Sequence, residues 1–139
     1  MHKVAVGILG ASGYAGRELC GLVARHPGME LAFAAANGQR GQRARFGASE
    51  ITFLAPDDGN LAAAEMVFRA LPHGASAEWV DAARGAGARV IDLSSDFRPG
   101  NTEAAAPYGL TEIMRDTIVG AELVANPGCY PTAVLIGLA

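Results

Sequence analysis

Hydrophobic and polar positions along this 139-residue chain fall into blocks that predict strands and helices in alternation. Residues 4–9 are almost wholly apolar, which is typical of a central parallel strand buried on both faces. A helical periodicity follows, and its apolar face carries Ala15, Leu19, Leu22 and Val23. Pro27 and Gly28 end this helix, and residues 29–36 form a second apolar strand. Together these segments predict a βαβ unit at the start of the chain.

The same alternation continues through the remainder of the chain. Residues 38–60 are rich in glycine and polar residues, with one candidate strand at 51–54. Further strands are predicted at 65–71, 88–93 and 118–125, and helices at 76–84, at 111–115 and from Pro131 onward. Pro131 suits the first position of a helix, where no backbone N–H is required. Alternating strands and helices predict one α/β domain over residues 1–139, with a Rossmann-like, doubly wound, mainly parallel sheet.

A glycine-rich stretch, Gly10-Ala11-Ser12-Gly13-Tyr14-Ala15-Gly16, joins the first strand to the first helix. Its spacing is G-x-x-G-x-x-G rather than the G-x-G-x-x-G dinucleotide fingerprint, but its place between strand and helix is the same. Gly10 permits a tight turn, Gly13 allows a phosphate to approach the backbone, and Gly16 allows the helix to pack closely on the strand. We therefore predict that all seven residues contact a dinucleotide cofactor. The alternative is a turn that needs glycine only for its positive φ angle.

The end of the second strand distinguishes NAD from NADP in folds of this type. A carboxylate there holds the ribose 2′-hydroxyl of NAD, whereas an arginine accommodates the 2′-phosphate of NADP. No acidic residue occurs in residues 31–49, and the strand is followed by Asn37-Gly38-Gln39-Arg40 and then by Arg43. Arg40 or Arg43 would pair with a 2′-phosphate, which favours NADP. The alternative is a solvated basic loop.

The segment Asn126-Pro127-Gly128-Cys129-Tyr130-Pro131-Thr132 lies between the last predicted strand and the last predicted helix. Pro127 and Gly128 allow a sharp turn that would expose the sulfur of Cys129. A sulfur just ahead of a helix N-terminus lies near unpaired N–H groups and the positive end of the helix dipole, which stabilise a thiolate. We predict that Cys129 is a catalytic nucleophile; the alternative is a small buried hydrophobic residue. Cys20 falls near the buried face of the first helix and is expected to be inert.

The carboxyl ends of parallel strands meet at one edge of a doubly wound sheet, and binding sites gather there. Four segments lie at that edge: the glycine loop, Pro72-His73-Gly74, Ser94-Ser95 and Cys129. We therefore predict that Pro72, His73 and Ser94 contact the cofactor together with the glycine loop.

Composition narrows the function classes. The formal net charge is -3 and no basic run occurs, which argues against a nucleic-acid partner. No Cys/His cluster has the spacing of a metal site, and the apolar runs are too short to span a membrane. The two cysteines lie far apart and the N-terminus carries no signal-peptide pattern, so we expect a cytoplasmic protein with free thiols.

Five motifs along the chain, taken together, resemble those of a known protein family. They are Gly-Ala-Ser-Gly-Tyr-Ala-Gly-Arg-Glu-Leu (10–19), Ala-Leu-Pro-His-Gly-Ala-Ser (70–76), Asp-Leu-Ser-Ser-Asp-Phe-Arg (92–98), Tyr-Gly-Leu-Thr-Glu (108–112) and Asn-Pro-Gly-Cys-Tyr-Pro-Thr (126–132). In this order they resemble N-acetyl-gamma-glutamyl-phosphate reductase of arginine biosynthesis, and the resemblance spans the whole chain. Ser95 stands where alanine is common and Thr111 where proline is common, and neither change is expected to alter the chemistry.

The resemblance implies an NADPH-dependent reductase that acts on a small-molecule acyl phosphate. In that chemistry Cys129 attacks the acyl-phosphate carbonyl to form a thioester, which is then reduced to the semialdehyde. The family's chains continue into a substrate and dimerisation domain that supplies an acid–base histidine, so a homo-oligomer is implied at full length. We interpret this chain as a truncated N-terminal portion that lacks the base, and we give His2, His26 and His73 no such role.

Some alternatives stay open at the level of the sequence. A reductase of aminoadipyl phosphate or aspartyl phosphate would keep the same chemistry, and a stand-alone NADP-binding domain would lack catalysis. Arg98 is expected to stabilise its loop through Asp92 or Asp96, or else to meet an anionic substrate.

Overall fold

The computed structural model describes residues 1–74, 76–101 and 106–139 of the chain. Its main sheet has five parallel strands in the order β2-β1-β5-β6-β7. These strands are β1 (Val4–Leu9), β2 (Met29–Ala35), β5 (Met66–Arg69), β6 (Arg89–Asp92) and β7 (Leu123–Ala125). A separate antiparallel hairpin consists of β3 (Arg43–Phe46) and β4 (Ser49–Thr52). The predicted fold class, a Rossmann-like parallel sheet, is confirmed.

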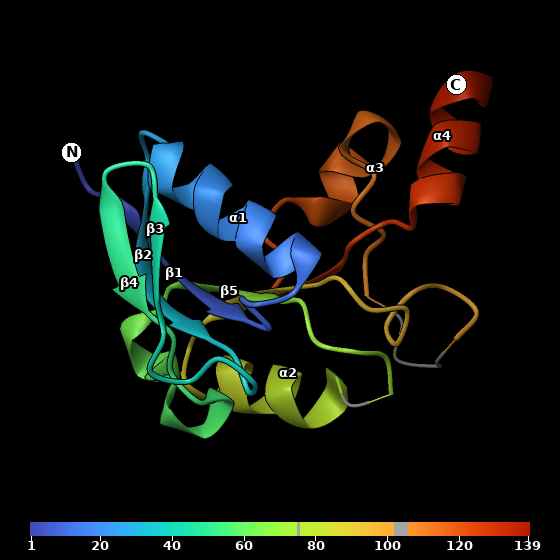
Figure 1. The fold of residues 1–139 in the computed structure, drawn as a ribbon. Coiled ribbons are helices and arrows are strands. Elements are labelled where there is room, and N and C mark those ends of the chain that lie inside the picture. The colour runs from blue at the N-terminus through green and yellow to red at the C-terminus, as the bar shows by residue number, and fades with distance from the viewer. Residues whose placement is uncertain (75, 102–105) are drawn as a thin grey trace.

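Helices cover both faces of this sheet. α1 (Tyr14–Arg25) and α2 (Ser76–Gly85) provide this cover. The other elements of the described residues are α3 (Thr111–Ile118), α4 (Cys129–Leu138) and the short 3-10 turns η1 (Pro56–Asp58) and η2 (Leu61–Ala63). Figure 1 shows α1 on one face and α2 on the other, which is the doubly wound arrangement. The chain passes from β1 to β2 and then returns to β5 on the other side of β1. The crevice of such a fold opens at this switch point, between β1 and β5.

Two hydrophobic clusters hold the helices on the sheet, because alternate residues of a strand point to opposite faces. On the α1 side, Val6 and Ile8 belong to a cluster that includes Cys20. On the α2 side, Leu9 belongs to a cluster that includes Val80. The core therefore lies in two layers, and the carboxyl edge of the sheet emerges between them.

The buried face of α1 differs from the predicted one. Val23 is buried and Leu19 packs against the core, as predicted, but Ala15 is exposed and Leu22 is 51% exposed. Gly16 and Cys20 are buried in their place. The reason is the close approach at Gly16, where a Cβ would collide with the backbone of the glycine loop. α1 therefore contacts the sheet along the row of residues that begins at Gly16, and Leu22, which lies outside this row, faces solvent.

Two further predictions need correction. The predicted strand at 118–125 contains only β7, because α3 extends to Ile118 and a turn at Gly120 (φ +79°) follows it. Residues 43–52 belong to a stretch that we interpreted as a polar loop with a single strand, but they form a hairpin. Along β3 exposed and buried residues alternate, and Phe46 packs into the cluster on the α1 side.

One row of paired residues crosses the sheet at its carboxyl edge. It consists of Ala35, Leu9, Arg69, Asp92 and Ala125, on β2, β1, β5, β6 and β7. Because neighbouring strands lie about 4.8 Å apart, the loops that begin directly after this row are neighbours in space. The glycine loop and the segments that begin at residues 70, 93 and 126 therefore share one edge.

Candidate functional site

The glycine loop packs against its own helix and against the segment that follows β5. Gly10 has a φ angle of +83°, and a Cβ there would collide with the carbonyl oxygen of Ala70. A Cβ on Gly16 would collide with the carbonyl oxygen of Gly10 and would lie 2.7 Å from the Cα of Ala11. At Gly13, by contrast, the nearest described atom to a Cβ would be 3.6 Å away. Protein packing thus requires glycine at positions 10 and 16, as predicted, but not at position 13.

The N-terminus of α1 carries the free amides of this loop. Gly13 is its N-cap residue, and no side chain among the described residues caps the helix. The amides of Gly10 and Ala11 both donate to the carbonyl of Ala35, at 2.9 Å each, so they are already used. The amides of residues 14–16 have no intrahelical acceptor. Because such amides bind phosphate, a contact with a pyrophosphate falls to this first turn.

The side chains of the loop differ in exposure. Ala11 is fully buried and its amide already donates to Ala35, so the structure leaves this residue no surface for the predicted contact. Ser12 is half-buried, and Tyr14 and Ala15 are exposed. A cofactor along this edge would therefore meet Tyr14 and the backbone, rather than a ring of polar side chains.

The two arginines predicted after β2 lie in different elements. Arg40 remains in the loop and pairs with Asp58 at 3.1 Å, both side chains being largely exposed. Arg43 lies on β3 and pairs with Glu50 at 3.7 Å. Only Arg40 therefore stays at the carboxyl end of β2, where a ribose phosphate would lie.

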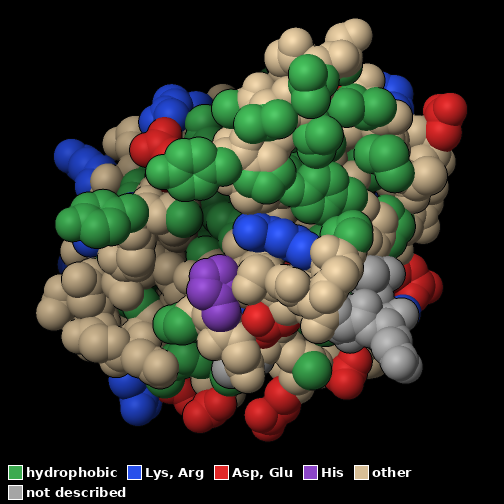
Figure 2. Space-filling view, turned by 90° about the vertical axis from the view of Figure 1, so that its right-hand side faces the viewer, with side chains coloured by type: hydrophobic (Ala, Val, Ile, Leu, Met, Phe, Trp, Pro, Cys, Tyr) green, Lys and Arg blue, Asp and Glu red, His purple; other side chains and the backbone are tan. Residues whose placement is uncertain are grey.

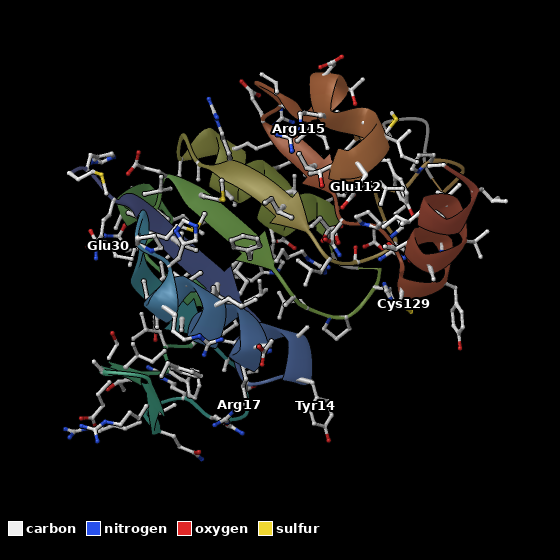
Figure 3. The ribbon with its side chains drawn as sticks, turned by 90° about the horizontal axis from the view of Figure 1, so that it is seen from above. Tyr14, Arg17, Glu30, Glu112, Arg115 and Cys129 are labelled. Carbon is white, nitrogen blue, oxygen red and sulfur yellow. The ribbon has the colours of Figure 1, made fainter. Side chains whose placement is uncertain are left out.

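A third arginine lies beside this loop and was missed by the sequence analysis. Arg17, in α1, donates a hydrogen bond to Oε1 of Gln39 at 3.5 Å. Figure 3 shows Arg17 and Tyr14 on the same side of the molecule as Cys129, with Glu30, near the amino end of β2, far from them. The signal was available in the spacing, because residue 17 is one helical turn beyond Gly13.

The segment after β5 presents Pro72 and His73 at the surface. Nδ1 of His73 accepts a hydrogen bond from the backbone amide of Ser95 at 3.0 Å, so the segment after β6 orients this ring. Ser94 is buried, and its hydroxyl donates to Oδ2 of Asp92 at 2.5 Å. The structure therefore leaves Pro72 and His73 open to a cofactor, whereas Ser94 is almost fully buried and offers no surface for the predicted contact.

Cys129 is exposed and is the first residue of α4. The sequence analysis placed Pro131 at that position, but the helix begins two residues earlier, with Gly128 as its N-cap. Pro131 is tolerated as the third residue because an N–H there has no intrahelical acceptor. The hydroxyl of Thr132 donates to the carbonyl of Gly128 at 2.7 Å and closes the first turn. This exposure excludes the alternative of a small buried hydrophobic residue.

Two side chains brace the backbone that carries Cys129. Arg98 donates from Nε to the carbonyl of Asn126 at 3.0 Å and from Nη2 to the carbonyl of Leu93 at 3.2 Å. The amide of Gly128 donates to the hydroxyl of Tyr108 at 3.3 Å. Arg98 thus joins the segments that follow β6 and β7, and its role in the loop is structural.

The carboxylates predicted to hold Arg98 have other partners, so that prediction is wrong. Asp92 lies in a buried network of its own. Asp96 accepts hydrogen bonds from the amides of Gly74 and Ser76. Burial by itself would raise the pKa of Asp96, but these hydrogen bonds hold it below its ordinary value. Backbone carbonyls, rather than carboxylates, are what Arg98 holds.

A hollow of about 470 Å³ lies beside the first turns of α4. Ser95, Arg98 and Asn101 supply polar groups to its wall, and Pro131 and Leu135 supply apolar ones. This volume is within the range of small-molecule sites. Figure 2 views this side of the molecule and shows hydrophobic side chains gathered over its upper part, which α3 and α4 occupy in Figure 1.

The second cysteine contrasts with the first. Cys20 is fully buried, and this burial raises the pKa of its thiol to about 11. Across residues 1–74, 76–101 and 106–139, no group of three or more His, Cys, Asp or Glu side chains is placed to hold a metal ion. Within the same ranges, the structure contains no helix with the length and apolar character needed to cross a bilayer.

A family model described as semialdehyde dehydrogenase, NAD binding domain, matches residues 5–121. The chain belongs to this family. It is 44% identical to N-acetyl-gamma-glutamyl-phosphate reductase from Halorhodospira halophila and 38% identical to the same enzyme from Archaeoglobus fulgidus. These alignments cover 97% and 94% of this chain but 46% and 45% of the relatives. The chain therefore spans about half the length of the curated relatives that it matches.

Solved structures show the same fold. Aspartate semialdehyde dehydrogenase II from Vibrio cholerae has a TM-score of 0.87 at 24% identity, covering 99% of this chain and 45% of that chain. A probable aspartate-semialdehyde dehydrogenase from Pseudomonas aeruginosa has a TM-score of 0.77 at 27% identity, covering 96% of this chain and 40% of that chain. The family assignment confirms the predicted class of cofactor, a nicotinamide dinucleotide.

Proposed function

We propose that this chain is the cofactor-binding and nucleophile-bearing portion of an N-acetyl-gamma-glutamyl-phosphate reductase. One observation carries the proposal: the glycine loop after β1 and Cys129 after β7 lie at the same edge of the sheet (Figure 3). An acyl-phosphate reductase needs a nucleophile beside a dinucleotide site. The relatives that bear this name are 38–44% identical, whereas the aspartate semialdehyde dehydrogenases above are 27% identical or less. The N-acetylglutamyl substrate is therefore favoured over aspartyl phosphate.

The cofactor that we assign to the glycine loop is NADP(H). The open side of Gly13 and the uncapped N-terminus of α1 fit a pyrophosphate, which the amides of residues 14–16 would bind. No acidic residue follows β2, and Arg17 and Arg40 flank the loop where a 2′-phosphate would lie. Arg40 would then exchange its exposed ion pair with Asp58 for a pair with the phosphate.

Cys129 is the residue that we assign to covalent chemistry. Its thiolate attacks the carbonyl carbon of the acyl phosphate, and a C–S bond forms as the C–O bond to phosphate breaks. Phosphate leaves with the electron pair of that bond, and a thioester remains on Cys129. NADPH, when bound, would supply the hydride that takes the acyl carbon to the aldehyde level, and the C–S bond would then break with its electron pair returning to Cys129 as the thiolate. Arg98 and Tyr108 hold the turn of residues 126–128 and so keep the sulfur at the edge.

The acid–base histidine is not among the three in this chain, according to the proposal. His2 pairs with Glu65 at 3.0 Å, beside the amino ends of the strands and far from Cys129 along the sheet. The rings of His26 and His73 each accept a hydrogen bond from a backbone amide. We assign the base, together with the contacts of a cytoplasmic homo-oligomer, to the half of the relatives' length that this chain does not span.

Cofactor binding tests the first part of the proposal. We expect calorimetric titration to give tighter binding of NADPH than of NADH. Gly13→Ala should weaken NADPH binding about tenfold, since its methyl group enters the phosphate space, and should leave Tm unchanged because packing does not require this glycine. Gly85→Ala, with no described atom within 4 Å of the new Cβ, is the matched control. Equal NADPH affinity of Gly13→Ala and wild type would contradict a pyrophosphate at this loop.

Thiol reactivity tests the second part. Near neutral pH, iodoacetamide should alkylate Cys129 much faster than Cys20 in the folded chain, because Cys129 is exposed and Cys20 is buried. Cys20 should react only after unfolding. Peptide mass spectrometry separates the two sites. Slow reaction of Cys129 together with intact NADPH binding would favour the alternative of a non-catalytic NADP-binding domain.

A further inference from the structure

Two buried charged residues lie side by side beneath the carboxyl edge. Arg69 ends β5 and Asp92 ends β6, and the two residues are paired in register across these parallel strands. Nη1 of Arg69 lies 3.2 Å from Oδ1 of Asp92, and both side chains are fully buried. From the sequence, Arg69 was given no role, and Asp92 was considered only as a partner for Arg98. They lie in the row from which every loop of the site begins.

Arg69 directs its donors to the main chain of the segment that follows it. Nη1 donates to the carbonyl of Leu71 at 3.1 Å, and Nη2 donates to the carbonyl of Pro72 at 2.7 Å. Hydrogen bonds from a charged donor are roughly twice as strong as neutral ones. The rigid fork of the guanidinium therefore fixes two consecutive peptide groups directly ahead of His73.

Two carboxylates tie the same segment to the loop after β6. Besides the guanidinium, Asp92 accepts hydrogen bonds from the hydroxyls of Ser76 at 3.3 Å and of Ser94 at 2.5 Å. Asp96 accepts the amide of Gly74 at 2.8 Å. Residues 71–74 are thus held from beneath by Arg69 and at their far end by Asp96, while their outer surface stays open to solvent.

Residues 70–74 form the wall of the crevice that faces the glycine loop. The crevice opens between β1 and β5, and the carbonyl of Ala70 lies directly against Gly10. With the 2′-phosphate after β2 and the pyrophosphate at α1, the remainder of a dinucleotide extends over β5 toward Cys129. Its nicotinamide half therefore meets this wall.

A buried ion pair of this kind is weak evidence for stability. Removing two charges from water opposes folding, and replacing a buried ion pair by apolar residues of similar size often leaves the stability of a protein unchanged or raises it. Within the described residues, Nε of Arg69 has no hydrogen-bond partner, so the arrangement is not the most stable one for this site. We propose, on the basis of the proposed function, that Arg69 is a positioning residue: its guanidinium holds residues 71–74 as the rigid wall that receives the nicotinamide half of NADP(H).

The test compares Arg69→Met, which keeps aliphatic volume and removes the guanidinium, with Arg89→Met at the exposed amino end of β6. The probes are NADPH and adenosine 2′,5′-bisphosphate, which contains only the adenine half. Arg69→Met should raise the Kd for NADPH about tenfold and change that for the bisphosphate less than about twofold, because only the nicotinamide half loses a preorganised wall. Arg89→Met should change neither Kd.

Amide hydrogen exchange without any ligand gives a second readout. In Arg69→Met the amide of Gly74, which donates to Asp96, should exchange about tenfold faster, while the amides of Gly10 and Ala11, which donate to Ala35, should not, because the brace acts locally. Arg69→Lys keeps the charge but not the fork, so its exchange rates and NADPH affinity should fall between those of Arg69→Met and wild type.

The outcomes separate this proposal from the proposed function. Equal loss of both ligands in Arg69→Met, or unchanged NADPH affinity, would overturn the positioning role alone. Failure of the wild-type chain to bind either ligand would overturn the proposed function, and the positioning role with it. If Arg69→Met does not fold because Asp92 becomes an unpaired buried charge, the double variant with Asp92→Asn removes that charge and permits the same comparison.

Discussion

Helices α1 and α4 begin alike and end in different surroundings. Each follows a strand of the main sheet and starts after an N-cap glycine, with no side-chain cap among the described residues. Four residues of α1 are buried, whereas none of the ten residues of α4, all of them described, is buried. Yet α4 has the more apolar sequence of the two. A helix that is apolar all round is normally enclosed, so α4 is the unusual member of the pair.

The difference shows that the two halves of the site depend on different contacts. The N-terminal end of α1, where we propose that phosphate binds, is held by packing within this chain. Cys129 is held by its turn, while the body of α4 presents Val134, Ile136 and Leu138 to solvent (Figure 2). Exposed apolar patches of this kind mark contacts with another protein surface. We therefore expect α1 to be the more stable helix and α4 to associate with other surfaces.

Replacement of a glycine by alanine should show the largest difference between α1 and α4 in the effect on the free energy of unfolding. Gly16→Ala in α1 should lower the free energy of unfolding by about 3 kcal/mol, because the new Cβ meets backbone atoms that cannot move away. Gly137→Ala in α4 should change it by less than about 0.5 kcal/mol, since no described atom lies within 4 Å of the Cβ. Urea denaturation followed by circular dichroism measures both. Similar losses would mean that α4 packs as tightly as α1.

Truncation of one valine in each helix probes burial rather than close approach. Val23 in α1 is 3% exposed, and Val23→Ala should lower the free energy of unfolding by about 2 kcal/mol. Val134 in α4 is 58% exposed, so Val134→Ala should change it by less than about 0.5 kcal/mol. The same denaturation experiment decides. A large decrease in the free energy of unfolding for Val134→Ala would show that another surface packs against α4 in solution.

Charge on the exposed face of α4 tests association directly. At high concentration the wild-type chain should self-associate, and Val134→Lys combined with Leu138→Lys should weaken this about tenfold or more, because apolar area can no longer be buried. Leu22→Lys, at an exposed position of α1, is the matched control and should leave association unchanged. Sedimentation velocity over a concentration series is the measurement. A wild-type chain that stays monomeric throughout would refute this expectation.

The smallest effect concerns the buried cysteine of α1. Burial raises the pKa of Cys20 from 9.0 to about 11, so the unfolded chain loses this proton first as pH rises. The stability that the protonated thiol contributes is complete below about pH 9 and is lost as pH rises toward 11. The difference in unfolding free energy between wild type and Cys20→Ala should therefore shift against wild type from pH 8 to pH 10. A constant difference, measured by urea denaturation under reducing conditions, would contradict burial of this thiol.

The local sequence pattern was sufficient to predict features whose structure depends on one short segment alone. The apolar run at residues 4–9 gave the bounds of β1, and the glycine spacing gave the tight turn at Gly10 and the close approach at Gly16. The turn before Cys129 was recognised from Pro127 and Gly128. Boundaries moved by a few residues where neighbouring elements competed, as α3 did with the strand predicted at 118–125.

The sequence pattern did not predict those features that depend on contacts between residues far apart in the sequence. The β3–β4 hairpin is short, and its alternation becomes meaningful only because Phe46 packs into the α1 cluster. Arg17 joins the candidate phosphate site only because α1 lies beside the loop after β2. Arg98 was matched to the nearest carboxylates, but it bonds the carbonyls of two different loops.

The sequence by itself determined the order of the main-sheet strands and of the helices between them, the glycine turn and the exposed position of Cys129, because these follow from local sterics and periodicity. Only the tertiary structure decided which side chains share the carboxyl edge. Arg69 and Asp92 are 23 residues apart, and they meet because β5 and β6 pair in one register. The physical reason is that strand pairing places residues far apart in the sequence at neighbouring positions, where a buried guanidinium and a buried carboxylate can bond to each other.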